Sequence, residues 1–336
     1  MPSTSKILVS RPRRRYAIAH VLFVLAAALV VPVAVAAESY PARPVRVVAP
    51  YPPGSSADVM GRIYARSLTE AFGRQFVVDN RSGASGNIAA ELVARAEPDG
   101  YTLLVLNTSV AANHLLQKSV PFDVERDFQV MGMLGIAPYL LVVNNALAAK
   151  SVKELIAMAK ANPGKLIYAS TGVGGGLHLT MELFRIQTGI NMLHVPYKGS
   201  STTVPDMIGG RIDVMFGSAP SLLVHVRAGR IRALAITSAK RSGAAPDVPT
   251  VDESGVPGFE SATFGAFVAP AKTPRSITGI LNTAIARSAQ SQEVAGALAT
   301  QGTDTAIMTP EQSAAYVHRQ IAKWKKVVET AGIRAE

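Results

Sequence analysis

Short apolar runs alternate along the chain with segments whose apolar residues recur every three or four positions. The runs at 45–50, 101–106 and 232–237 show little polar alternation, which is typical of strands that are buried on both faces of a sheet. Between them, segments such as 60–71 have helical periodicity. The alternation therefore predicts an α/β fold class in which helices cover a largely parallel sheet.

The predicted β–α units fall into two sets. The first set runs to about residue 140 and the second follows it, after which the chain returns to helices that need a sheet to pack on. The simplest architecture that satisfies this order has two doubly wound α/β domains, the first of them discontinuous. We expect domain 1 to comprise residues 38–142 and 262–336 and domain 2 to comprise residues 143–261.

The first 37 residues differ from the rest of the chain. A basic segment that ends at Arg15 precedes an apolar stretch at 17–33, and small residues near Ala37 offer a cleavage site. This order is typical of a secretory signal peptide, and an uncleaved membrane anchor is the alternative. No later apolar run reaches the roughly 18 residues of a membrane span, so we expect an exported protein that is soluble after cleavage.

Charge and cysteine content limit the possible partners. The chain carries 34 Lys and Arg against 23 Asp and Glu, a formal net charge of +11. The first 37 residues hold five basic residues and no acidic residue, so the remaining chain carries +6. No later basic block is interleaved with aromatic residues, which argues against a nucleic-acid partner. Because the chain has no cysteine, its core alone must hold an exported protein together.

The strongest candidate for a ligand site lies at residues 167–178. An apolar strand ends there in Ser170, Thr171 and Gly172, further glycines follow, and a helical pattern starts at Leu177. Several backbone N–H groups and the positive end of a helix dipole then meet at one point, which favours an anion. The alternative is a tight turn that binds nothing.

A second strand–loop–helix junction covers residues 51–58. Its loop is rich in glycine and serine, and Asp58 stands near the helix start, where it either caps the helix or contacts a ligand. A third glycine loop follows the next strand at 80–86. Ligands of such sheets lie beyond the carboxyl ends of the strands, so two domains would place these loops across one cleft.

Other polar and aromatic residues allow two interpretations each. His178 either reaches a ligand or has a capping and packing role, and Lys198 either reaches an anion or lies in solvent. Asp213 either holds a ligand ammonium group or fixes a loop. Trp324, the single tryptophan, lies on an apolar stripe of the last helix, and we expect it to pack that helix onto the body of the protein.

The sequence offers no pattern for catalysis. It lacks a G-x-S-x-G elbow and any cysteine, and its histidines do not have the spacing of a zinc site. The main glycine loop lacks the last glycine of G-x-G-x-x-G, which argues against a dinucleotide. We therefore expect no enzyme activity, no catalytic residue, no metal and no cofactor, but a binding site for an anionic group, most simply a carboxylate.

An ordered set of motifs spans nearly the whole chain after residue 37. The motifs are YPARPVRVVAPYPPGSSAD, NRSGASGN, EPDGYTLL, YASTGVGGGLH, HVPYKGS, IGGRIDVMF, GRIRALAIT and VAPAKTP. In this set the sequence resembles the Bug family, the TctC-like periplasmic solute-binding subunits of tripartite tricarboxylate transporters. The resemblance implies a type II periplasmic binding protein fold, whose two α/β domains close on a carboxylated metabolite.

The resemblance also implies which residues bind the ligand. In the family, backbone N–H groups of the two loops hold the carboxylate, often through water, and no dedicated arginine does so. The ligand-binding residues carried over to this chain are Tyr51, Gly54, Ser55, Ser56, Ala57 and Asp58 on one wall, Ser170, Thr171, Gly172, Gly175, Gly176 and His178 on the other, Tyr197, Lys198 and Asp213 nearby, and Thr108 and Ser109 at the floor. The family usually has a second glycine where this chain has Ser55, whose side chain narrows the approach.

The resulting hypothesis is a monomeric periplasmic solute-binding protein. It would capture a dicarboxylate or tricarboxylate, an aromatic acid or an acidic amino acid and deliver it to membrane permease subunits. One alternative is a protein that binds the same solutes but docks on the sensor kinase of a two-component system. The other is an exported hydrolase that uses one of the serines, which the missing elbow argues against.

Overall fold

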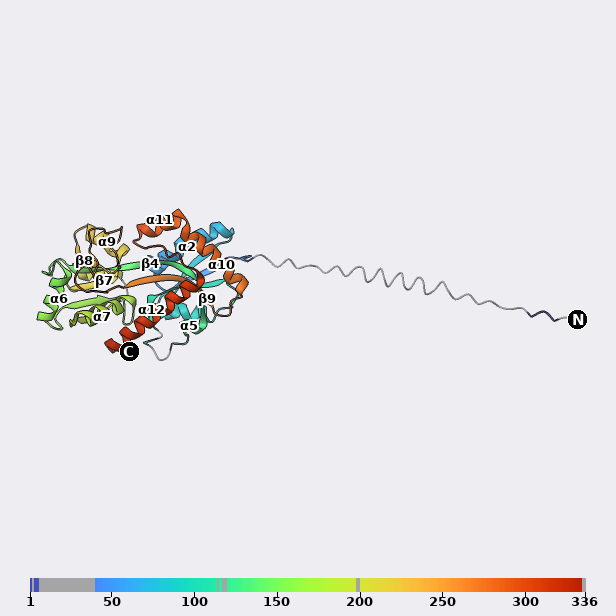
Figure 1. The fold of residues 1–336 in the computed structure, drawn as a ribbon, viewed down its shortest axis with the longest axis horizontal. Helices are drawn as coiled ribbons and strands as arrows, with labels where there is room; N and C mark the ends of the chain where they lie inside the picture. Colours follow the sequence, from blue (N-terminus) through green and yellow to red (C-terminus); the bar gives the residue numbers. More distant parts are fainter. Residues whose placement is uncertain (2, 6–39, 114, 117–119, 198–199, 334–336) are drawn as a thin grey trace. The chain divides into compact units, whose positions relative to one another are not determined.

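The computed structural model describes residues 1, 3–5, 40–113, 115–116, 120–197 and 200–333. The chain divides into two units, residues 1–39 and residues 40–336. The elements of the larger unit (Figure 1) are β1 (Val45–Ala49), α2 (Ser56–Phe72), β2 (Phe76–Asn80), η1 (Ala84–Gly86), α3 (Asn87–Ala94), β3 (Thr102–Asn107), α4 (Thr108–Asn113), α5 (Val124–Asp127), β4 (Phe128–Asn144), α6 (Val152–Ala161), β5 (Ile167–Ser170), α7 (Gly176–Thr188), β6 (Leu193–Pro196), α8 (Ser200–Ile208), β7 (Val214–Ser218), α9 (Ala219–Arg227), β8 (Ile231–Ile236), β9 (Ala262–Pro270), α10 (Arg275–Gln290), α11 (Gln292–Thr300) and α12 (Pro310–Ala331).

The described strands form a nine-stranded sheet in the order β2-β1-β3-β9-β4-β7-β5-β6, with β8 paired to β4. Strands β2, β1 and β3 are parallel to one another, and so are β6, β5 and β7. Strands β4 and β9 run antiparallel to their neighbours. The α/β prediction is confirmed, but the sheet is mixed, because β9 runs antiparallel to β3 and β4, and β4 runs antiparallel to β7 and β8.

Strand β4 joins the two parallel groups. The sequence predicts two extended segments at 128–135 and 138–143, whereas the structure has one 17-residue strand. This strand pairs with β9 up to Pro138 and with β7 and β8 from Tyr139 onward. The chain therefore passes from the first group to the second through β4 and returns through β9, as Figure 1 shows for β4.

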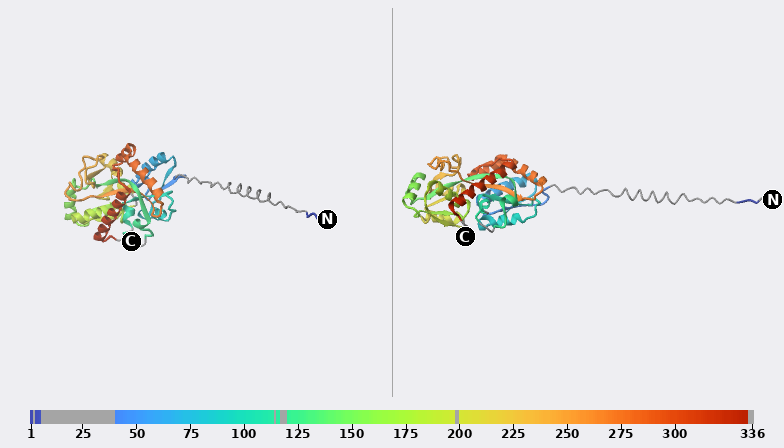
Figure 2. Two further views of the ribbon diagram at one scale, coloured as in Figure 1. Left: turned by 45° about the vertical axis from the view of Figure 1, so that its right-hand side comes forward. Right: turned by 60° about the horizontal axis from the view of Figure 1, so that its bottom comes forward.

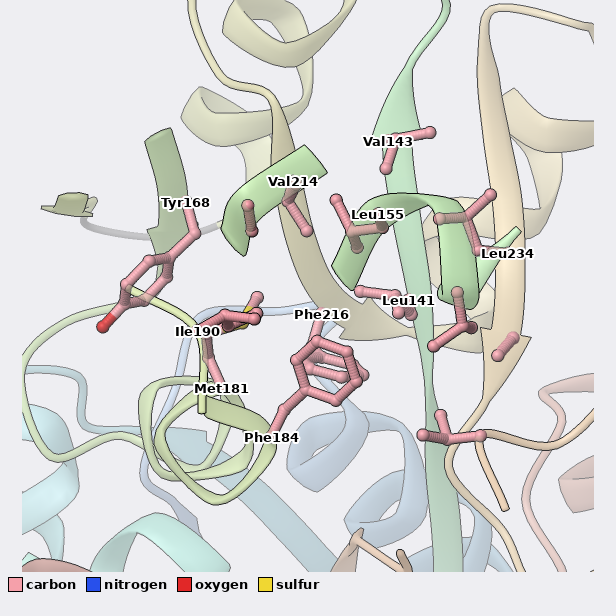
Figure 3. Close-up of a cluster of buried hydrophobic side chains, with 14 of the residues drawn as sticks. Leu141, Val143, Leu155, Tyr168, Met181, Phe184, Ile190, Val214, Phe216 and Leu234 are labelled. Atoms are coloured by element: carbon pink, nitrogen blue, oxygen red, sulfur yellow. The ribbon is translucent and has the colours of Figure 1, made fainter. Parts of the chain in front are cut away.

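Separate apolar cores form beside the two groups of strands. In the first group, α2 and α10 pack on β1, β3 and β9 through side chains such as Tyr64 and Phe267. In the second, α6 and α7 pack on β4, β5 and β7, and the rings of Phe184 and Phe216 meet edge to face at 5.8 Å (Figure 3). The views in Figures 1 and 2 agree that α6, α7 and α9 lie together, apart from α2 and α10.

The last helix, α12, is packed by the only tryptophan. Trp324 is fully buried in a small cluster with Ala112 of α4 and Leu179 of α7. The expectation that this residue packs the helix onto the body of the protein is confirmed. Among the described helices, none is both long enough and apolar enough to cross a membrane.

Candidate functional site

A cavity of about 350 Å³ lies where the helices α2, α7 and α9 begin. Strand β3 ends at this cavity, and the crossing strands β4 and β9 contribute to its lining. The lining residues are Tyr51, Pro52, Pro53, Gly54, Ser55, Ser56, Ala57, Asn107, Ser109, Tyr139, Thr171, Gly176, Leu177, Ser218, Ser221 and Thr263. The two glycine-containing junctions of the sequence thus face one shared space.

The first wall is the loop at residues 51–57, which leads into α2. The sequence allows Asp58 to cap this helix, but Ser55 is the cap, because its hydroxyl accepts the Asp58 N–H at 3.3 Å. Asp58 is 2 % exposed, and its carboxylate accepts the Gly54 N–H at 2.9 Å. Asp58 therefore lies behind the loop and holds it from within.

Two further side chains complete this support. Asn80 Nδ2 donates to Asp58 Oδ1 and to the Tyr51 carbonyl, both at 2.8 Å, and Arg62 forms an ion pair with Asp58 at 3.0 Å. Burial by itself raises the pKa of Asp58. The hydrogen bonds from Arg62, Gly54 and Asn80 outweigh it and hold the pKa below its ordinary value. The carboxylate is therefore charged at neutral pH and fixes the first wall.

We predict that Asp58→Asn lowers the free energy of unfolding by roughly 1–3 kcal/mol, because Gly54, Asn80 and Arg62 then share one oxygen acceptor. The lowered pKa means that the carboxylate contributes stability above its unfolded pKa, and this contribution is lost as the pH falls through the folded value. The variant should lack this acid-dependent loss. Urea unfolding at several pH values measures both effects.

The matched control for this prediction is Glu70→Gln on the same helix. Glu70 is exposed and pairs with the exposed Arg66, so its loss should change stability by less than about 0.5 kcal/mol. Equal effects of the two variants would contradict the assigned role of Asp58.

The second wall is the loop at residues 171–176, which leads into α7. Gly174 has φ +75°, and a Cβ there would lie 2.0 Å from Leu116 Cδ1, so only glycine fits. Gly176 donates its N–H to Ser109 Oγ at 2.9 Å. A Cβ on Gly176 would lie 2.8 Å from Tyr139 Oη. The backbone of the second wall therefore lies directly against Ser109 and Tyr139, with no room for a side chain at Gly176.

The floor is formed where β3 meets α4. Ser109 lines the cavity, whereas Thr108 is fully buried beneath it and donates to the Ala262 carbonyl at 3.3 Å. Tyr139 and Thr263 complete the floor from β4 and β9. Burial raises the pKa of Tyr51 to about 12 and also raises that of Tyr139, so both phenols stay protonated at neutral pH.

The predicted site residues do not all reach the cavity. Those that line it are Tyr51, Gly54, Ser55, Ser56, Ala57, Ser109, Thr171 and Gly176. Those that do not line it, but form hydrogen bonds within its walls or floor, are Asp58, Thr108, Ser170, Gly172, Gly175 and His178. The structure thus divides the predicted set into residues that face the space and residues that position them.

Two predicted residues have other surroundings, and a third is not described. Tyr197 precedes α8, and its hydroxyl donates to Oδ2 of Asp206 within that helix at 2.7 Å. Asp213 accepts the Ile167 N–H at 2.8 Å, at the amino end of β5, which is opposite to the end that meets the cavity. This arrangement matches the loop-fixing interpretation of Asp213. Lys198 lies outside the described residues.

Several lining residues are absent from the sequence-based set. Ser218 and Ser221 stand where β7 ends and α9 begins, and the rule that selected the glycine loops would also have selected this junction. Asn107 ends β3 and Leu177 follows the second wall. Tyr139 and Thr263 lie within strands, where no local sequence signal distinguishes a cavity residue from a core residue.

None of the described lining residues is charged. The first N–H groups of a helix have no intrahelical acceptor, and Ser56, Ala57 and Leu177 stand at such positions in α2 and α7. These donors and the helix dipoles give the cavity partial positive charge without a cationic side chain. Hydroxyl and amide groups supply the remaining polar contacts. The cavity is therefore suited to a small anion.

A cluster of aromatic and histidine rings lies behind the second wall. The rings of His178 and His194 stack at 4.1 Å, and His194 stacks on Tyr168 at 4.7 Å. Tyr168 donates its hydroxyl to Glu182 Oε1 at 2.5 Å, and Figure 3 shows this hydroxyl pointing away from the apolar cluster. Arg185 donates to the same oxygen at 2.7 Å. Burial lowers the pKa of both histidines, that of His194 to about 4.

The Ser170–His194 contact tests the hydrolase alternative. Ser170 Oγ lies 2.7 Å from His194 Nε2, the distance of a nucleophile and its base. Ser170 is fully buried, however, and its hydroxyl also bonds to the backbone of Gly172 in both directions. A substrate cannot reach this oxygen, so the pair holds the loop. Among the described residues, no group of three or more His, Asp or Glu is placed to hold a metal ion.

The low pKa of His194 predicts a loss of stability in acid. The unfolded state takes up a proton near pH 6.5 and the folded state near pH 4, so stability falls as the pH drops through this window. The contribution is at most about 3 kcal/mol. His194→Gln should remove this part of the pH dependence, as urea unfolding between the two pH values would measure. A matched His318→Gln change at an exposed histidine should keep it.

Solved structures share this fold. R. palustris Rpa4515 with adipate is 37 % identical to the chain, with a TM-score of 0.83, over 88 % of this chain and 99 % of that one. MatC from Rhodopseudomonas palustris with bound malate is 27 % identical, with a TM-score of 0.79, over 86 % and 100 %. The fold and the uncharged cavity at the helix starts define a solute-binding protein of the periplasmic binding protein class.

The chain belongs to the TctC family, described as tripartite tricarboxylate transporter family receptors, whose sequence profile matches residues 60–333. It is 39 % identical over 315 residues to the protein BugT of Bordetella pertussis, which covers 93 % of this chain and 96 % of that protein. The predicted resemblance to the Bug family is confirmed. Members of this family are periplasmic solute-binding receptors and not enzymes.

Proposed function

We propose that this protein captures a small carboxylate, foremost an aliphatic dicarboxylate, in the cavity between the two walls. The observation that carries the proposal is the meeting of the α2 and α7 helix starts at a cavity with no charged side chain among its described lining residues. Such a cavity neutralises an anion through main-chain N–H groups. The adipate and malate bound to the two similar proteins support this ligand class.

Ligand capture would involve closure of two lobes. We assign residues 38–142 and 262–336 to one lobe and residues 143–261 to the other. The first wall belongs to the first lobe and the second wall to the second, while Tyr139 and Thr263 lie near the crossings. Residues 1–37 act in this proposal as a cleaved signal peptide that directs the protein to the periplasm. Mass measurement of the protein recovered from the periplasm tests that cleavage.

The test of ligand capture is calorimetry of the exported protein with adipate, malate, benzoate and glutamate. Adipamide is the matched neutral ligand, because it keeps the length of adipate but lacks its charges. We expect micromolar or tighter binding of at least one dicarboxylate and no binding of adipamide. Failure of every carboxylate to bind, or equal binding of adipamide, would overturn the proposal.

Delivery of the ligand to membrane permease subunits is the second part of the proposal. It follows the family, whose members are transporter receptors. Deletion of the gene should abolish uptake of the radiolabelled ligand by intact cells. Normal uptake together with loss of a transcriptional response to the ligand would instead assign the protein to a two-component sensor.

A further inference from the structure

We propose that His178 is a positioning residue that holds the second wall in its binding geometry only while its imidazole is neutral. The inference rests on the proposed function, because the wall matters through the ligand that it contacts. His178 itself does not line the cavity. It acts on the ligand through the backbone of residues 171–176.

The contact between His178 and the wall is direct. The Gly174 N–H donates to His178 Nδ1 at 3.0 Å, and His178 is 5 % exposed. Leu116 packs against Gly174, because a Cβ on this glycine would lie 2.0 Å from Leu116 Cδ1. Thr171 and Gly176, on either side of Gly174, line the cavity. Displacement of Gly174 therefore moves two residues that face the ligand.

The hydrogen bond fixes the tautomer of the ring. Nδ1 must be unprotonated to accept the Gly174 N–H, so the proton of the neutral ring is on Nε2. Nε2 faces Glu182 Oε1 at 3.8 Å, and this oxygen also accepts from Tyr168 and Arg185. A negative oxygen at that distance favours a proton on Nε2 and leaves Nδ1 free for the wall.

A second proton would break this arrangement. On Nδ1 it would oppose the Gly174 N–H, so that two donors face each other in a buried position. Among the groups that face the ring, burial and Arg185 disfavour the charged form, whereas Glu182 favours it. The stacked His194 has a pKa lowered to about 4 and is neutral in mild acid. The start of α7 also disfavours a cation. His178 is therefore neutral while the wall is in place, and its protonation displaces the wall.

The sign of the pH effect follows from this coupling. A displaced wall leaves His178 with a more ordinary pKa, so acid below about pH 6.5 stabilises the displaced form. Ligand affinity should then fall in mild acid. A direct charge–charge role would act in the opposite direction, because an imidazolium attracts a carboxylate. The two roles are thus separable by the direction of the pH dependence.

Two amide variants form the matched pair for the test. His178→Asn places an amide oxygen near the position of Nδ1 and cannot titrate, so it keeps the bond from Gly174. His178→Gln places its amide near Nε2 and leaves the Gly174 N–H without an acceptor. At neutral pH we expect wild type and H178N to bind adipate alike and H178Q to bind about tenfold more weakly.

The pH dependence provides the decisive comparison. Between about pH 7 and pH 5.5 the adipate dissociation constant of wild type should rise at least about threefold relative to that of H178N. The titration of adipate itself is common to both proteins and cancels in the ratio. An equal pH profile, or a wild-type affinity that rises relative to H178N in acid, would overturn the inference.

Two further measurements need no ligand. Amide hydrogen exchange of the 171–177 segment should be about tenfold faster in H178Q than in wild type and H178N, and equal exchange would overturn the inference. Nitrogen-15 NMR of wild type should show the Nε2–H tautomer of His178, and the Nδ1–H tautomer would overturn it without any variant. If wild type binds no carboxylate, the proposed function fails, while these measurements still decide whether His178 positions the loop.

Discussion

Gly176→Ala should weaken ligand binding by about tenfold to a hundredfold while the protein still folds. A Cβ at this position would lie 2.8 Å from Tyr139 Oη and 3.5 Å from Ser109 Oγ, at the closest approach of the second wall to the floor. The backbone of Gly176 is not in the left-handed region, so the cost is steric crowding at the cavity and not strain within the helix. Overpacking of this kind costs about 1–3 kcal/mol. Calorimetry with adipate measures the loss.

The matched control is Gly296→Ala in α11. No atom lies within 4 Å of a Cβ at that position, and the residue does not line the cavity. The control should bind adipate as wild type does and be slightly more stable, because alanine has the higher helix propensity. Undiminished binding by Gly176→Ala would show that the second wall is not in contact with the ligand.

Trp324→Ala should lower the free energy of unfolding by about 3–5 kcal/mol. The indole is fully buried and packs α12 against α4 and α7, including Ala112 and Leu179. Its removal would leave a cavity at the point where α12 contacts two other helices. Urea unfolding followed by circular dichroism measures the change, because the variant has no tryptophan fluorescence.

Trp324→Phe provides the graded comparison. Phenylalanine refills part of the volume, so its cost should be clearly smaller than that of alanine. Equal and small effects of both changes would show that α12 contributes little to stability. Loss of ligand binding by Trp324→Phe without a loss of stability would point instead to a ligand contact, which the burial of the ring argues against.

Much of the candidate site could be predicted because its signals are local. A strand followed by a glycine and serine loop and a helix start can be recognised in the sequence, and this pattern located the two loops that form the walls of the cavity. The individual ligand-binding residues were those that the resemblance to the Bug family implied. The sequence allowed Asp58 to cap the helix, whereas Ser55 caps it in the structure. Serine and aspartate are both good caps. In the structure Ser55 accepts the N–H of Asp58, and Asp58 accepts the N–H of Gly54.

The remaining site residues depend on contacts between distant parts of the chain. Tyr139 and Thr263 reach the cavity only because β4 and β9 pair across about 125 residues of sequence, and long-range pairing leaves no local signature. Asp213 could have been excluded only from the strand direction, which places it at the amino end of β7. The mixed sheet was unpredictable for the same reason, since apolar strands do not reveal their pairing direction.

The crossing strands β4 and β9 constrain any movement of the first group of parallel strands relative to the second. Thr237 is bonded both to Tyr139 of β4 and to Ser261, immediately before β9, so the two crossings are tied together at one level. Tyr139 and Thr263, which line the cavity, stand at that level as well. In the proposed lobe closure, side chains at this pivot would therefore also line the ligand cavity. A ligand of different size would then change the angle between the two groups of strands in the closed form. A partner protein that contacts both groups would bind with an affinity that depends on this angle, and thus on the ligand.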